Sequence, residues 1–131
     1  MEKILRIEDT TFKTSEKEWE SYEGYQIVTD VQTIKVGISS GKSCCENYGY
    51  MSTNDDLKEF EDSELFSIEV VNESLNVKSI EDAGFDEGEA MFVNFNTSKG
   101  VLQLVAYNSH NGYYGHDAVL ISKQLNHEEI L

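Results

Sequence analysis

The chain has 131 residues, of which 39% are hydrophobic and 11% aromatic, a composition that predicts one folded domain with a substantial core. Its 25 Asp and Glu against 10 Lys and Arg give a formal charge of −15, which argues against direct binding to nucleic acid or to an anionic membrane surface, since both need a basic protein face. Two interpretations of the acidity remain: charge that keeps a small protein soluble, or charge that complements a basic partner protein.

The sequence also restricts the compartment. No apolar run approaches the roughly 18 residues of a membrane-spanning helix, and residues 1–9 lack the features of a signal peptide. The two cysteines, Cys44 and Cys45, are adjacent, so a disulfide between them would close a negligible loop and stabilise little. We therefore expect a cytoplasmic protein rather than a secreted disulfide scaffold.

The start of the chain is polar and weakly patterned. Over residues 1–20, Leu5, Ile7 and Phe12 could line one side of a short strand. Residues 15–20 could begin a helical turn.

From residue 25 onward the pattern indicates strands. Residues 25–29 are β-branched and aromatic, which favours a strand. After a turn at residues 30–32, residues 33–38 alternate apolar and polar side chains, as a half-buried strand does. Residues 44–53 have no regular pattern. Residues 54–60 offer an N-cap residue, early acids and a Leu–Phe pair, which predict one or two helical turns.

The second half of the chain predicts four further strands. Residues 65–71 predict a strand, and residues 72–89 a polar, acidic connection. Residues 91–95 and 101–107 flank a short turn that ends in glycine, which predicts a β-hairpin. A final strand is expected at residues 117–122.

These elements predict a mainly β (α+β) fold, either a single antiparallel sheet or a small barrel-like fold of about five or six strands with one short helix, because the links are hairpin-length. We expect one domain over residues 1–131, with its core at about residues 22–125 and a frayed tail at residues 126–131. Acid is concentrated over residues 46–89, where 14 Asp and Glu stand against two lysines.

Two segments hold residue types that could do chemistry. Cys44, Cys45 and Glu46 could join histidines further along the chain as zinc ligands, but their spacing is not that of a structural zinc finger. We favour a packed pair of thiols. Residues 108–117 hold two histidines, two asparagines, two tyrosines and two glycines, a set that can stack on and hydrogen-bond a ligand or a protein partner. The alternative is a structural loop whose tyrosines cover the end of the sheet.

These motifs resemble the two marks of a family of small uncharacterised phage and bacterial domains. The first is Cys44-Cys45-Glu46 and the second is His110-Asn111-Gly112-Tyr113-Tyr114-Gly115, and the upstream run Tyr22-Glu23-Gly24-Tyr25 fits as well. The resemblance covers roughly residues 22–122, with a departure at Ser109, where it leads us to expect Glu. It implies a phage or prophage origin and no established activity.

The first functional hypothesis is a phage-encoded acidic binding protein that inhibits a host defence or DNA-handling protein, of the anti-CRISPR or anti-restriction type. Its acidic side chains would occupy a basic groove that normally holds DNA phosphates, as a DNA mimic does, and complementary charge would speed association. The expected partner is therefore a host protein with a basic surface. The expected partner-binding residues are Asp55, Asp56, Glu59, Glu61, Asp62 and Glu64.

The alternative is a domain that binds a metal or a small molecule such as a nucleotide signal. Its expected ligand-binding residues are Cys44, Cys45, Glu46, His110, Asn111, Tyr113, Tyr114 and His116. An enzyme is not expected, because the sequence offers no convincing set of nucleophile, base and orienting group. We accordingly assign no catalytic residue and no resident cofactor.

Overall fold

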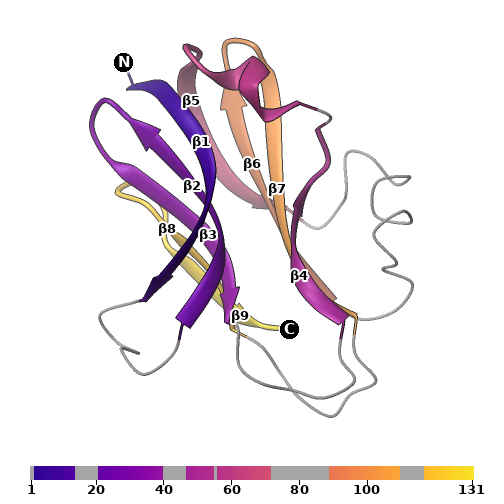
Figure 1. The fold of residues 1–131 in the computed structure, drawn as a ribbon. Helices are drawn as coiled ribbons and strands as arrows, with labels where there is room; N and C mark the ends of the chain where they lie inside the picture. The colour runs from indigo at the N-terminus through magenta and orange to yellow at the C-terminus, as the bar shows by residue number, and fades with distance from the viewer. Residues whose placement is uncertain (1, 14–20, 40–46, 55, 72–88, 110–116) are drawn as a thin grey trace.

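The structure, a computed structural model, describes residues 2–13, 21–39, 47–54, 56–71, 89–109 and 117–131 (Figure 1). In chain order these residues form β1 (Glu2–Lys13), β2 (Ser21–Thr29), β3 (Thr33–Ser39), β4 (Asn47–Ser52), the 3-10 turn η1 (Leu57–Phe60), β5 (Glu64–Val71), β6 (Glu89–Thr97), β7 (Gly100–Ser109), β8 (Asp117–Ile121) and β9 (His127–Ile130). The predicted class is confirmed, since the described residues are mainly β with almost no helix. The predicted number of strands is wrong: the sheet has nine strands rather than five or six.

All nine strands belong to one open antiparallel sheet with the order β4-β7-β6-β5-β1-β2-β3-β8-β9. Antiparallel neighbours are what hairpin-length links allow. β1 joins the two halves of the sheet, because it pairs with β2 along most of its length and with β5 through Glu2 and Lys3. Of the two predicted architectures, the single antiparallel sheet is the observed one.

The sheet folds back on itself, so that its halves face each other across the main core (Figure 1). β4 and β7 of one half pack against β2 and β3 of the other. The main core consists of Ile4, Ile27, Ile34, Val36, Ile38, Phe60, Leu65, Met91, Val93, Phe95, Leu102, Leu104, Ala106, Ala118, Leu120 and Leu131. It reaches beyond the expected residues 22–125, since Ile4 and Leu131 are both buried.

The strands with the clearest sequence pattern lie where they were predicted. β2, β3, β5 and β8 match their predicted ranges within a few residues. The predicted hairpin is β6–β7, whose turn is tighter than expected because Thr97 and Gly100 are already cross-strand partners. Gly100 has a φ of 114°, which glycine adopts without steric cost.

β1 is longer than predicted, and different side chains from those predicted face the core. It has 12 residues, and its pairing with β2 is interrupted by an irregularity between Ile4 and Arg6. Such a bulge shifts which side chains face the core. Ile4 is therefore fully buried while Leu5 is 44% exposed, and Leu5, Ile7 and Phe12 do not line one face. Phe12 belongs instead to a second buried cluster with Tyr22 and Val119.

β4 and β9 were not predicted as strands. β4 has a central Gly49 and no β-branched residue, so the expected irregular stretch at residues 44–53 is wrong over Asn47–Ser52. The expected frayed tail is also wrong. β9 pairs with β8, and the Leu131 carbonyl accepts a hydrogen bond of 3.1 Å from Asn108 Nδ2 of β7. β8 is therefore not the last strand. The helical turn predicted at residues 15–20 lies outside the described residues, as does most of the predicted acidic connection at residues 72–89.

Candidate functional site

Five of the six predicted partner-binding acids lie on one described segment, residues 56–64, termed here the acidic turn. It comprises η1 and the entry into β5. Asp56 caps η1, because its Oδ1 accepts a hydrogen bond of 2.9 Å from the Lys58 backbone N–H. Among the described residues, the helix is this single 3-10 turn, the shorter of the two predicted lengths. Asp55 lies outside the described residues.

Two buried residues hold the acidic turn to the sheet. Phe60 packs into the main core, and the fully buried Ser63 donates its hydroxyl hydrogen bond to the Phe60 carbonyl. The Ile4 N–H of β1 donates to the Ser63 carbonyl at 2.9 Å, and the Ile4 carbonyl accepts from the Asp62 N–H at 2.8 Å. The backbone of the acidic turn is therefore fixed against β1.

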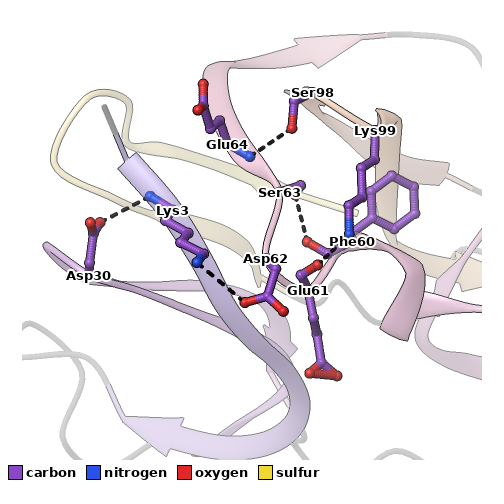
Figure 2. A network of polar contacts seen from close by, with 9 residues as sticks. All are labelled: Lys3, Asp30, Phe60, Glu61, Asp62, Ser63, Glu64, Ser98 and Lys99. Carbon is purple, nitrogen blue, oxygen red and sulfur yellow. Dashed lines mark hydrogen bonds and ion pairs between the residues drawn. The ribbon is translucent and has the colours of Figure 1, made fainter.

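The β6–β7 turn supports the acidic turn from its other side (Figure 2). The Glu64 N–H donates to Ser98 Oγ at 2.9 Å, and the Ser98 N–H donates to the Glu64 carbonyl at 2.9 Å. Lys99 Nζ donates a hydrogen bond of 2.8 Å to the Glu61 carbonyl oxygen. Two elements distant in sequence thus fix the position of the acidic turn.

The surface charge of the acidic turn is lower than its sequence suggests. Asp56, Glu59 and Asp62 are exposed, and the other two acids are half-buried. Lys3 Nζ lies 3.6 Å from Asp62 Oδ1, and this exposed ion pair contributes little to stability. Together with Lys99, Lys3 brings positive charge from other parts of the chain. The acidic excess of this surface remains, although it is reduced.

The residues of the alternative ligand site lie outside the described residues. This applies to the Cys44-Cys45-Glu46 motif and to the site residues between His110 and His116. Their flanks, however, are described. Asn47 is the cross-strand partner of Ser109, and the Asp117 N–H donates a hydrogen bond of 3.0 Å to Ser39 Oγ. The two segments therefore start and end at neighbouring positions of the sheet.

A group of aromatic and acidic residues between the two halves was missed by the sequence reasoning. Tyr25 of β2 and Tyr50 of β4 contact edge to face, with ring centroids 5.0 Å apart and ring planes at 86°. Asp9 of β1 is the cross-strand partner of Tyr25. Glu23 precedes Tyr25 by two residues and so faces the same side of β2. These four residues are termed the tyrosine corner.

The phenols of the tyrosine corner are perturbed by their surroundings. Burial raises the pKa of Tyr25 to about 12, with Asp9 and Tyr50 adding to the effect. Burial also raises the pKa of Tyr50, and the charges of Asp9 and Glu23 contribute. Both carboxylates therefore act on the phenols, although the residues come from three strands that are far apart in sequence. No spacing pattern in the sequence could have indicated this group.

Within the described ranges, no group of three or more His, Cys, Asp and Glu side chains is placed to hold a metal ion. No helix among those same residues is long and apolar enough to cross a membrane.

Comparison with known proteins gives a family and no further relative. The family model described as a domain of unknown function, DUF7448, matches residues 1–120. This confirms the expectation of an uncharacterised family, while the two motifs that carried the resemblance lie outside the described residues. No curated protein and no solved structure matches the chain.

Proposed function

Since the chain belongs to the DUF7448 family, whose description assigns no function, we propose its role from its surface: it is an acidic protein-binding domain that presents the acidic turn to a basic host protein. In the specific form of this proposal, the domain is phage-encoded, works in the cytoplasm of the infected bacterium, and inhibits a defence or DNA-handling protein by occupying its DNA-binding surface. It is not an enzyme in this proposal.

The observation that carries the proposal is the fixed, outward presentation of the acids. Phe60 and Ser63 of the acidic turn are buried, while Asp56, Glu59 and Asp62 around them are exposed. A carboxylate on an anchored turn loses less conformational freedom on binding than one on a mobile segment. Charge complementarity would then speed association and make it sensitive to salt.

The test is capture from a bacterial lysate followed by displacement with DNA. The tagged protein is immobilised and incubated with lysate at low salt, and bound proteins are eluted with duplex DNA and identified by mass spectrometry. We expect a DNA-binding protein that leaves the resin with DNA or with high salt. A captured protein that duplex DNA cannot displace would overturn the DNA-mimic form.

A pair of charge-matched variants tests whether the acidic turn is the surface that binds the captured protein. Glu59→Lys/Glu61→Lys reverses two acids of the acidic turn, and Glu69→Lys/Glu129→Lys makes the same charge change on β5 and β9. The first variant should lose the captured protein and the second should retain most of it. Equal capture by both variants would show that the acidic turn is not the binding surface.

The alternative, a metal or small-molecule site at Cys44-Cys45-Glu46 and residues 110–116, is supported by one observation. The strands that flank the two segments are neighbours at both ends, through the Asn47–Ser109 pair and the Ser39–Asp117 hydrogen bond. Metal analysis and mass spectrometry of small molecules released from the denatured protein test this alternative. A bound species that is lost in Tyr113→Ala/His116→Ala would favour it over the acidic-turn proposal.

A further inference from the structure

The tyrosine corner combines two features that attract organic cations. The rings of Tyr25 and Tyr50 stand at 86° to each other, so they form two walls of a corner rather than a closed stack. The face of an aromatic ring attracts a cation through its quadrupole. The second feature, negative charge, is supplied by Asp9 beside Tyr25 and by Glu23 on the same strand face.

Among the described residues, no basic side chain is paired with the carboxylates of this corner, since no Lys, Arg or His forms an ion pair with Asp9 or Glu23. Asp9 is exposed, Tyr25 and Tyr50 are half-buried, and all are thus accessible in part. Burial is the main cause of the raised pKa of both phenols, and the negative charge of Asp9 close to both rings adds to it.

We propose that the tyrosine corner binds an alkylammonium group, with the faces of Tyr25 and Tyr50 against its carbon atoms and Asp9 and Glu23 facing its charge. An ammonium ion with an alkyl stem suits this combination, because the stem packs on the rings while the charge meets the carboxylates. The site is independent of the proposed function, since the acidic turn contributes none of these residues. It would add a second, chemically distinct binding surface.

The test is a titration of the intact protein with n-butylammonium chloride, followed by NMR of the tyrosine ring protons. We expect saturable shifts of the Tyr25 and Tyr50 signals, and smaller, non-saturating changes with the neutral control n-butanol. Equal shifts with both compounds, or none with butylammonium, would overturn the proposal. A second titration with N-acetyl-lysine methylamide identifies the source of the alkylammonium group. If this compound binds more tightly than butylammonium, the natural ligand is a lysine side chain. If it binds more weakly, the natural ligand is a free amine.

Variants locate the site. Asp9→Asn should weaken butylammonium binding several-fold, whereas Glu69→Gln, which removes the same charge from β5, should leave it unchanged. Tyr50→Phe keeps the ring and should stay within about 2-fold of the wild type, while Tyr50→Leu should lose about 2- to 5-fold. Asp9 is exposed, so Asp9→Asn tests the site even if Tyr50→Leu unfolds.

Binding that survives Asp9→Asn unchanged would place the cation elsewhere. Glu59→Lys/Glu61→Lys should not affect this binding, which separates the site from the acidic turn.

Discussion

Gly24 and Gly37 are cross-strand partners at a point where β2 and β3 leave no room for side chains. A Cβ on Gly24 would lie 2.0 Å from the Val36 carbonyl oxygen, and one on Gly37 would lie 2.7 Å from the Glu23 carbonyl oxygen and 2.8 Å from a ring carbon of Phe12. Glycine in a strand often marks such a close backbone approach. The run Tyr22-Glu23-Gly24-Tyr25, noted in the sequence only as part of a resemblance, thus has a packing reason.

These distances predict a ranking of glycine substitutions. Gly37→Ala should lower the free energy of unfolding by about 1–3 kcal/mol, the usual cost of overpacking, and Gly24→Ala by at least as much because backbone atoms obstruct it. Gly49→Ala is the control, since its Cβ would meet only the Tyr107 side chain, with the hydroxyl oxygen nearest at 3.2 Å, and no backbone atom within that distance. Urea unfolding of the three variants gives the order. A Gly37→Ala variant more stable than the wild type would contradict the close approach. The lower conformational entropy that alanine gives the unfolded chain would then outweigh any clash in the folded state.

Tyr25 predicts a loss of stability at alkaline pH. Burial raises the pKa of Tyr25 from 10.0 to about 12 in the folded state, so the unfolded chain releases this proton at lower pH than the folded one. The contribution of the protonated Tyr25 phenol to the free energy of unfolding is complete below about pH 10, and it is lost as the pH rises toward about 12. Tyr25→Phe has no proton to release and should flatten this decline. Urea midpoints across this pH range measure the difference, and parallel declines in both proteins would show that other groups cause it.

At the scale of elements, the sequence predicted a strand where the alternation of apolar and polar side chains matches the faces that the folded strand buries and exposes. β3 shows its alternation directly, and the β6–β7 hairpin shows two strand-like runs around a glycine turn. β4 failed the same criteria because its strand character comes from pairing with β7 rather than from residue type. β1 failed because a bulge, which no sequence periodicity encodes, changes its facing side chains.

β9 yields a prediction that separates an integrated strand from a frayed tail. Leu131→Ala should cost about 2–4 kcal/mol, because the side chain is 4% exposed in the main core. Leu5→Ala removes the same atoms from a side chain that is 44% exposed and should change stability by about 0.5 kcal/mol or less. Thermal or urea unfolding compares the two variants. Equal, small effects would mean that the chain end that follows β9 is not packed into the core.

At the scale of the whole molecule, the two candidate surfaces differ in how far the sequence could reveal them. The acidic turn is contiguous in sequence, so its composition was visible at once, although its anchoring by Ile4 and Ser98 was not. Lys3 of β1 and Lys99 of the β6–β7 turn, which reduce its charge, also come from distant parts of the chain. The tyrosine corner is built wholly by the folding of the sheet, so no linear pattern contains it.

The net charge of −15 predicts that salt stabilises this protein. The described ion pairs, such as Lys3–Asp62 and Arg6–Glu8, join exposed side chains and so contribute little to stability. Repulsion among the excess carboxylates acts over longer distances and is screened when the Debye length falls to about 10 Å at 0.1 M salt. Raising NaCl from about 0.02 M to about 0.3 M should therefore raise the melting temperature by several degrees.

A charge-reduced variant provides the control for this salt effect. Glu59→Gln/Glu69→Gln removes two negative charges on the acidic turn and on β5, so it should melt higher than the wild type at low salt and gain less from added NaCl. Differential scanning calorimetry at both salt concentrations measures the two gains. A melting temperature that falls with salt would mean that attraction within ion pairs outweighs the repulsion, and that the acidic excess is compensated in the folded molecule far better than the exposed pairs suggest.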